Sequence, residues 1–98
     1  MQVGVDSVVA AMEQRLAGLQ PELLEIRDQS GEHAGHPGAQ GGGGHYQVLI
    51  VSPRFDGQSR VARHRMVYEA LGAMLHKQIH ALALTTLTPQ ELQEVFPP

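Results

Sequence analysis

The sequence predicts a small α+β fold in the order α-β-β-α(α)-β-α, with a three-stranded mixed sheet covered by helices on one face. Two observations support this prediction. Apolar residues recur at helical spacing in two segments, 5–19 and 59–75, and three short apolar runs of strand length lie at 22–28, 45–52 and 79–84. A chain of 98 residues is expected to be a single domain, 1–98, with a modest core.

The first helix is predicted from the spacing of its apolar side chains. Asp6 or Ser7 is expected to cap its start, and Gly18 lies near its end. The apolar positions that define its buried stripe are Val5, Val8, Val9, Met12, Leu16 and Leu19.

The first strand, 22–28, follows Pro21 and alternates in polarity. Leu24 and Ile26 share one face, while Glu25 and Arg27 point to the other. Such one-sided polarity is typical of an edge strand in a sheet that is covered on one side.

The segment Ser30–Gly44 is rich in glycine and also contains a proline and two histidines. Neither a helix nor a sheet tolerates that composition, so a long flexible loop is expected. Loops of this length in a compact domain are either functional or disordered, and the sequence leaves both interpretations open.

The second strand, 45–52, is a nearly continuous apolar run, which favours the central position in the sheet. Pro53 and the turn Phe55-Asp56-Gly57 end it. The third strand, 79–84, is a short apolar run for which we expect a buried position. Strands one and two should pair as an antiparallel hairpin, and a right-handed crossover should place strands two and three parallel, in the order 1-2-3.

The second helical segment, 59–75, carries Val67, Leu71 and Met74 on one side. Arg60 and Arg63 fall on that same side, so we expect a break near the start, with a short first turn before the main helix. A last short helix is predicted after the third strand, where Thr88 can act as N-cap and Pro89 occupies the first helical position.

Charge and composition limit the function. The net charge is −3, yet residues 54–77 carry an excess of basic side chains that can face an anionic partner or form an ordinary solvated surface. The N-terminus lacks the features of a signal or transit peptide and there is no long apolar run, so a soluble cytoplasmic protein without a membrane segment is expected. No nucleophile context or phosphate-binding glycine loop is found, which makes an enzyme the least favoured class.

The chain contains no cysteine and six histidines. It therefore lacks a thiolate nucleophile and the usual ligand of iron–sulfur clusters. His33 and His36 lie three residues apart in the glycine loop, which alone is a weak metal signal. His80 lies at the mouth of a strand directly after a helix, although a single histidine there is more often an ordinary hydrogen-bonded residue.

Three pieces of sequence, in this order and spacing, resemble the BolA family: VSPRFDG at 51–57, RHRMVYEAL at 63–71 and IHALAL at 79–84. The resemblance covers nearly the whole chain and implies a class II KH-like fold. It also implies a non-enzymatic adaptor that pairs with a monothiol glutaredoxin and shares a [2Fe-2S] cluster, in iron–sulfur cluster trafficking or iron regulation. The partner would supply its own cysteine and the thiol of glutathione.

By position in the family pattern, His80 is the strand ligand of the cluster and His33 the loop ligand, with His36 as a competitor for the second place. Two neutral imidazoles on one iron replace two thiolates in Rieske centres, so the chemistry is consistent with this assignment. His45 is expected to border the site from the second strand. His64 is expected to pack against the helix and His76 to lie at a helix end.

The resemblance also carries an alternative, because some family members are described as DNA-binding transcription regulators. The chain has no GXXG loop of the kind that RNA-binding KH modules use, and it has few aromatic residues for stacking. Phosphate contacts would come from Arg54, Arg60, Arg63, Arg65 and Lys77. A structural role for these arginines is the favoured interpretation. One departure from the family pattern is Leu92, which stands where a tryptophan is usual.

Overall fold

The three strands form one mixed sheet in the order β1-β2-β3, with β1 antiparallel and β3 parallel to the central β2. The computed structural model describes residues 5–29 and 44–97. Its elements are α1 (Val5–Leu16), the 3-10 helix η1 (Ala17–Leu19), β1 (Leu23–Asp28), β2 (Gly44–Val51), the 3-10 helix η4 (Pro53–Phe55), α2 (Arg60–Leu71), α3 (Met74–Lys77), β3 (Ile79–Leu87) and α4 (Pro89–Val95).

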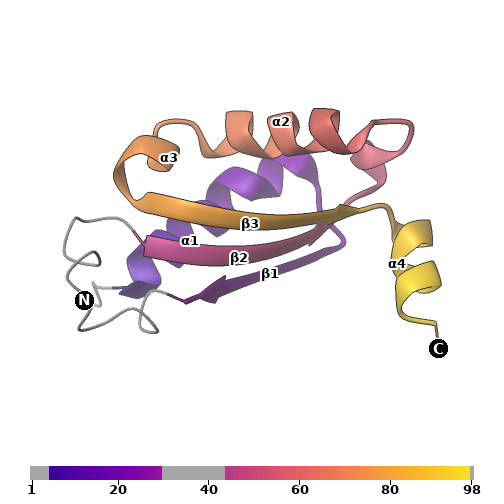
Figure 1. The fold of residues 1–98 in the computed structure, drawn as a ribbon, viewed down its shortest axis with the longest axis horizontal. Helices are drawn as coiled ribbons and strands as arrows, with labels where there is room; N and C mark the ends of the chain where they lie inside the picture. The colour runs from indigo at the N-terminus through magenta and orange to yellow at the C-terminus, as the bar shows by residue number, and fades with distance from the viewer. Residues whose placement is uncertain (1–4, 30–43, 98) are drawn as a thin grey trace.

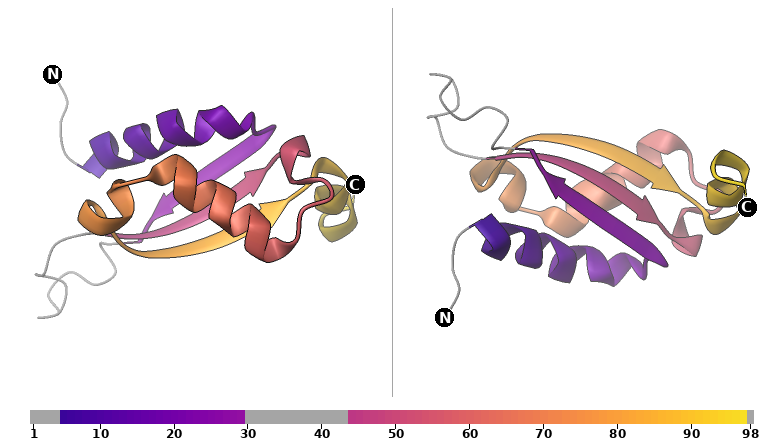
Figure 2. Two further views of the ribbon diagram at one scale, coloured as in Figure 1. Left: turned by 90° about the horizontal axis from the view of Figure 1, so that it is seen from above. Right: turned by 90° about the horizontal axis from the view of Figure 1, so that it is seen from below.

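Helices α1 and α2 lie side by side on one face of the sheet, while α4 extends beyond the end of β3 (Figures 1 and 2). The predicted fold class, strand order and strand directions are therefore confirmed. The core lies between the sheet and these two helices. It contains Met12, Leu16, Leu19, Tyr46, Val48, Ile50, Phe55, Val67, Leu71, Met74 and Ile79.

The start of the first helix differs from its prediction. Because α1 begins at Val5, Asp6 and Ser7 lie inside its first turn and neither is its N-cap. At the other end Gly18 lies within η1, and the left-handed residue that closes the turn is Gln20, with φ 55°. The helical path ends only where the backbone reverses toward Pro21 and β1.

The prediction of a break near the start of the second helical segment is wrong, and the segment is instead interrupted near its other end. Helix α2 is continuous from Arg60 to Leu71, and it stops at Gly72, whose φ of 60° favours glycine. The chain then resumes as α3. No break is needed near the start, because Arg63 finds an ion-pair partner on the buried side of the helix.

Strand β3 is longer and less buried than predicted. It continues to Leu87, and its exposed and half-buried residues alternate along most of its length. The physical reason is that β3 is an edge strand of a sheet covered on one face only, so half of its side chains face solvent. Gly44, which was expected to end the glycine loop, is instead the first residue of β2. The remainder of that predicted loop, 30–43, lies outside the described residues.

Candidate metal centre

Two histidines meet at the end of the sheet where β2 and β3 begin. The parallel register pairs Gly44 with Ile79 and then His45 with Ala81, so one extra residue, His80, is inserted in β3. This irregularity is a β-bulge, a feature that re-aims a side chain and is common next to functional sites. The backbone is held just before the bulge, since the Gly44 amide donates to the Gln78 carbonyl at 2.8 Å.

The bulge determines on which face of the sheet the His80 side chain lies. Ile79 is buried in the core, and Leu82 packs against the same core. In a regular strand His80 would share the core-facing side with Leu82, because side chains alternate with a period of two. The inserted residue breaks that alternation, so Ile79 takes the core-facing position and both His80 and Ala81 are exposed. A rigid strand thus presents an imidazole at the surface.

The second imidazole belongs to His45, the second residue of β2. Its ring centroid lies 5.2 Å from that of His80, and the two rings are tilted by 39°. His45 therefore lies beside His80, while its predicted place at the border of a cluster site stays a prediction. We refer to His45 and His80 as the histidine pair.

The other predicted ligands, His33 and His36, lie outside the described residues. The chain enters and leaves that segment close to the histidine pair, since the Gln29 amide donates to the His45 carbonyl at 2.8 Å. Within 5–29 and 44–97, no group of three or more His, Asp and Glu side chains is arranged to hold a metal ion. The described part of the chain thus brings two imidazoles, those of His45 and His80, together at this end of the sheet.

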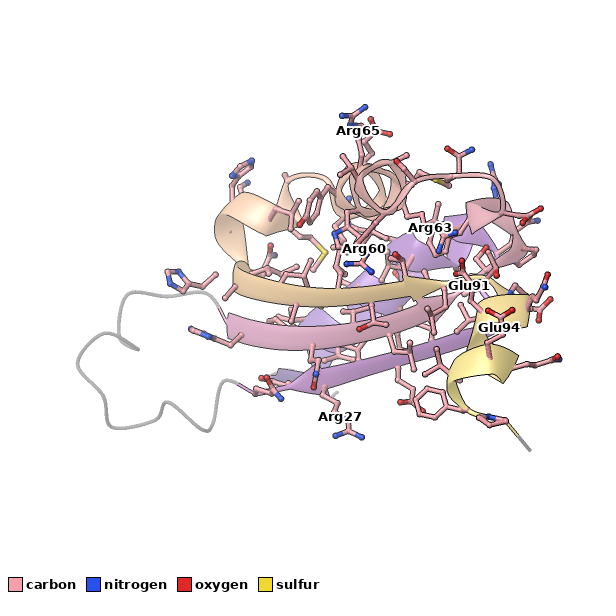
Figure 3. The ribbon with its side chains drawn as sticks, turned by 45° about the vertical axis from the view of Figure 1, so that its right-hand side comes forward. Arg27, Arg60, Arg63, Arg65, Glu91 and Glu94 are labelled. Carbon is pink, nitrogen blue, oxygen red and sulfur yellow. The ribbon has the colours of Figure 1, made fainter. Side chains whose placement is uncertain are left out.

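At the opposite end of β3, Arg63 and Glu91 form a bidentate ion pair. Arg63 Nη1 lies 2.6 Å from Glu91 Oε1, and Nη2 lies 3.1 Å from Oε2. The guanidinium also donates to the Thr86 and Gln58 carbonyls and lies over the Phe55 ring, with 6.0 Å from Cζ to the ring centroid. We call this set of contacts the arginine clamp, and it joins α2, β3 and α4 (Figure 3).

Glu91 is itself held by the start of α4. Its carboxylate accepts from the Thr88 amide at 2.9 Å, and its own amide donates to Thr88 Oγ1 at 3.1 Å, which is a capping box. The predicted N-cap Thr88 and first-turn Pro89 are confirmed. The hydrogen bond from Arg63, followed by that from the Thr88 amide, lowers the pKa of Glu91 to about 2. The same bond to Glu91 raises the pKa of Arg63.

The basic residues proposed as phosphate contacts do not form one surface. The Arg63 side chain is 12% exposed and engaged in the clamp, whereas Arg60, Arg65 and Lys77 are exposed. Arg65 points away from the sheet, and Arg60 points toward β3 (Figure 3). Arg63 therefore links α2 to β3 and α4, a pairing that the sequence did not predict.

The remaining histidines lie on the helices. His64 is half-buried on α2, with its ring edge-on to Tyr68 at 6.4 Å between centroids. His76 lies in the last turn of α3, as predicted. Leu92, which replaces the usual tryptophan, is half-buried in α4, a helix without fully buried residues.

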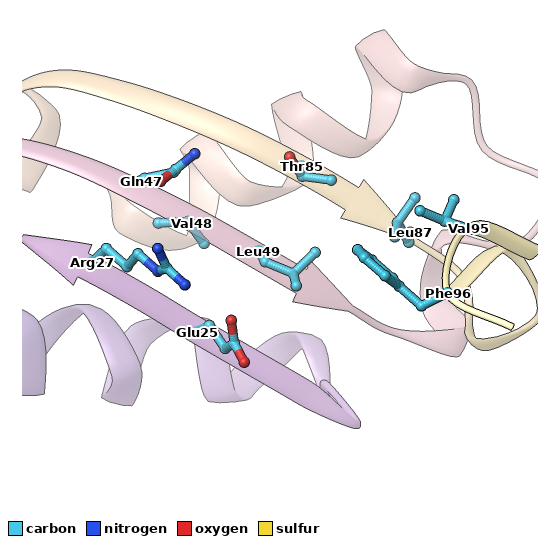
Figure 4. Close-up of a pocket in the computed structure, with 9 residues that line it drawn as sticks. All are labelled: Glu25, Arg27, Gln47, Val48, Leu49, Thr85, Leu87, Val95 and Phe96. Carbon is cyan, nitrogen blue, oxygen red and sulfur yellow. The ribbon is translucent and has the colours of Figure 1, made fainter. Parts of the chain in front are cut away.

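The uncovered face of the sheet carries a shallow groove near α4. Its volume is ≈ 370 Å³, and it is lined by Glu25, Arg27, Gln47, Val48, Leu49, Thr85, Leu87, Val95 and Phe96 (Figure 4). Its apolar lining comes from β2, β3 and the C-terminal end of α4, and neither residue of the histidine pair lines it. The helices in the described ranges are all too short or too polar to cross a bilayer.

The α-β-β-α-β-α order around a mixed β1-β2-β3 sheet defines a small KH-like α+β protein of the class II type. Within that class the chain belongs to the BolA family. The family model for BolA-like protein matches residues 16–91.

Individual relatives agree with this assignment. BolA-like protein 1 of Homo sapiens is 42% identical over 91 residues, which cover 92% of this chain and 64% of the relative. The DNA-binding transcriptional regulator BolA of Escherichia coli is 41% identical over 75 residues, covering 76% of this chain and 69% of that protein. The solution structure of BolA1 from Mus musculus superposes with a TM-score of 0.77 at 38% identity, covering 97% of this chain and 76% of that one. The chain thus spans slightly less than two thirds of the human protein's length.

Proposed function

We propose that this chain is a non-enzymatic adaptor that binds a monothiol glutaredoxin and co-ligates a [2Fe-2S] cluster, in the cytoplasm, in cluster trafficking or iron regulation. His80 is the rigid ligand, and His33 is the mobile one, with His36 as its competitor. The partner contributes its cysteine and the thiol of glutathione.

One observation carries the proposal: the β-bulge that turns His80 out of the core at the end of the sheet. A bulge interrupts the ladder of hydrogen bonds between two strands, and bulges are common next to functional sites. Its presence at a histidine therefore favours a binding role for that side chain. The clustering of a second imidazole from His45 at the same place adds support.

The donor chemistry is consistent with a shared cluster. The chain has no cysteine, so the thiolates that bind iron must come from elsewhere. When bound, a [2Fe-2S] cluster supplies one-electron chemistry whose potential rises when imidazoles replace thiolates. The chain's own task is to present His80 from a strand whose neighbouring residues are fixed by the core, and thereby to limit the conformational entropy lost on binding.

The test is to mix the chain with a holo monothiol glutaredoxin and to record the visible absorption and circular dichroism of the cluster. The variants are His80→Ala, His33→Ala and His36→Ala, with His76→Ala as a matched control on an exposed histidine. We expect a spectral change with the wild type and with His76→Ala, a larger loss with His80→Ala, and a smaller loss with His33→Ala. A wild-type spectrum identical to that of glutaredoxin alone would contradict the proposal.

A second candidate function is DNA binding, which the name of the Escherichia coli relative favours. Arg54 is exposed on η4, and the exposed cations for phosphate contacts on α2 and α3 are Arg60, Arg65 and Lys77, since Arg63 is committed to the clamp. Replacing these three with Gln should weaken duplex binding equally across sequences and reduce the salt slope by about 1 per lost contact. Electrophoretic mobility or anisotropy measurements at several salt concentrations check this. Binding indifferent to the substitutions would eliminate the candidate.

A further inference from the structure

We propose that a small pocket between α2 and the free edge of β3 binds a phosphate group, through the Arg60 guanidinium, the His64 imidazole and the Thr86 amide. The pocket has a volume of ≈ 280 Å³. It is lined by Arg60, His64, Leu84, Thr85, Thr86 and Leu87. This site goes beyond the adaptor function, because it uses neither a glutaredoxin nor any of the proposed cluster ligands.

The α2 wall of the pocket carries two nitrogen donors. Arg60 and His64 are four residues apart on α2, so their side chains lie on the same side of the helix. Arg60 points toward β3 (Figure 3), and a guanidinium presents two parallel N–H groups to an oxyanion. His64 is half-buried, and an imidazole donates at least one N–H in either protonation state.

The β3 wall adds a backbone donor. The Thr86 carbonyl accepts from Arg63 Nη1 at 3.2 Å, whereas the next carbonyl, that of Leu87, accepts from the Ser52 amide just beyond β2 at 2.9 Å. Consecutive residues of a strand direct their backbone polar groups to opposite sides, so both the N–H and the C=O of Thr86 face the free edge of β3. Because Arg63 already donates to that carbonyl, the Thr86 N–H is the group that Thr86 offers to a ligand.

The charge of the pocket favours an anion. None of its six lining residues carries a carboxylate. Glu91, which the arginine clamp holds near the same strand, accepts from Arg63 and from the Thr88 amide, so its negative charge is already compensated. The two leucines of the lining reduce the access of water, and a lower local dielectric strengthens hydrogen bonds to a charged group.

The size and donor type select a phosphate group. Pockets for drug-sized ligands measure about 300–1,000 Å³, so a volume of ≈ 280 Å³ fits a small anion better than a larger organic molecule. Arginine and backbone amides are common partners of phosphate oxygens. The same chemistry fits a free phosphate ion and a phosphate of a nucleic-acid backbone.

The experiment is a titration of the ¹⁵N-labelled full chain with inorganic phosphate, followed by amide NMR signals at fixed pH and at an ionic strength held constant with NaCl. We expect saturable shifts at the amides of Arg60, His64, Leu84 and Thr86. Exchanging one chloride concentration for another, without phosphate, should leave these signals unchanged.

Variants on α2 test the side-chain donors. Arg60→Gln should weaken phosphate binding by about tenfold or more, because hydrogen bonds to a charged group are lost. His64→Leu should weaken it by a smaller factor, and His64→Gln, which keeps an N–H donor, should retain part of the affinity that His64→Leu loses. Arg65→Gln is the matched control, because Arg65 lies on the same helix and points away from the sheet (Figure 3), and its affinity should equal that of the wild type.

Three results would overturn the site: no saturable shift in the wild type, the same affinity in Arg60→Gln as in the wild type, or a loss in Arg65→Gln as large as that in Arg60→Gln. The unperturbed amide signals of α1 in each variant report whether the fold is retained.

A second titration, with a short DNA duplex, distinguishes the two sources of phosphate. If the ligand is a backbone phosphate, the duplex shifts the same amides and inorganic phosphate displaces it. If the ligand is a free phosphate ion, only inorganic phosphate shifts them. Since no glutaredoxin is present and His80 takes no part, failure of this test is distinguishable from failure of the adaptor proposal.

Discussion

The polar side chains at the two ends of β3 differ in their surroundings. At the far end, the arginine clamp pairs Arg63 and Glu91 within the chain, through a bidentate pair and several backbone contacts. At the near end, the bulge turns His80 outward to meet His45 at the surface. Arg63 and Glu91, which pair with each other, therefore act in the stability of the fold. His80, which a backbone irregularity presents at the surface, is a candidate for binding.

The largest expected effect is a difference in the free energy of unfolding between variants at the two ends of β3. Phe55 is fully buried beneath Arg63, so Phe55→Ala should lower the free energy of unfolding by about 3–5 kcal/mol through the cavity it leaves. His80→Ala, at an exposed position, should change it by less than about 0.5 kcal/mol. Urea denaturation followed by circular dichroism measures both. Comparable losses in the two variants would mean that His80 is a structural residue.

A smaller loss of stability is expected when the arginine clamp is removed and the core is left intact. Arg63→Met keeps much of the apolar stem but removes the donors to Glu91 and the Thr86 carbonyl. We expect a loss of stability below that of Phe55→Ala and above that of Arg65→Met, the matched control on the exposed side of α2. The urea midpoints of the three variants test this order. An Arg65→Met midpoint as low as that of Arg63→Met would contradict a special role for the clamp.

The smallest effect is a dependence on pH. The pKa of Glu91 falls from 4.5 to about 2 on folding, chiefly because of the hydrogen bond from Arg63. A group with a depressed native pKa adds stability above its unfolded pKa and loses it as the pH falls toward its native one. The stability advantage of wild type over Glu91→Gln should thus be complete at pH 6 and shrink progressively between about pH 4.5 and about pH 2.

Thermal unfolding of both proteins across that pH range provides the measurement. Glu94→Gln, on the exposed surface of the same helix, serves as the control and should show no comparable change. A difference between wild type and Glu91→Gln that stays constant down to pH 2 would show that the carboxylate is not stabilised by the clamp.

Much of the fold could be predicted because its signals are local. The spacing of Val67, Leu71 and Met74 marked the buried side of a helix, and Thr88-Pro89 marked the start of the last one. The break in the second helical segment was predicted near its start rather than at Gly72, for a different reason. Arg63 on the apolar stripe looked like a conflict, and only the position of Glu91, far along the chain, removes it.

The candidate site was predictable only in part. The resemblance pointed to His80, and the sequence placed His45 nearby, but no local pattern revealed the bulge that turns His80 outward. That irregularity depends on the register between β2 and β3, which is a relation between distant segments. The clamp had one readable signal, a glutamate three residues after a capping threonine, yet its arginine partner could be found only in three dimensions.

We propose above that this chain contributes the imidazole of His80 to a cluster shared with a monothiol glutaredoxin. The most direct measurement is pulsed electron paramagnetic resonance of the reduced mixed complex, with ¹⁵N-histidine incorporated in this chain only. We expect ¹⁵N couplings from the labelled chain in wild type, with the His80 coupling lost in His80→Ala and unchanged in His76→Ala. A cluster spectrum without any ¹⁵N coupling from the labelled chain would contradict it.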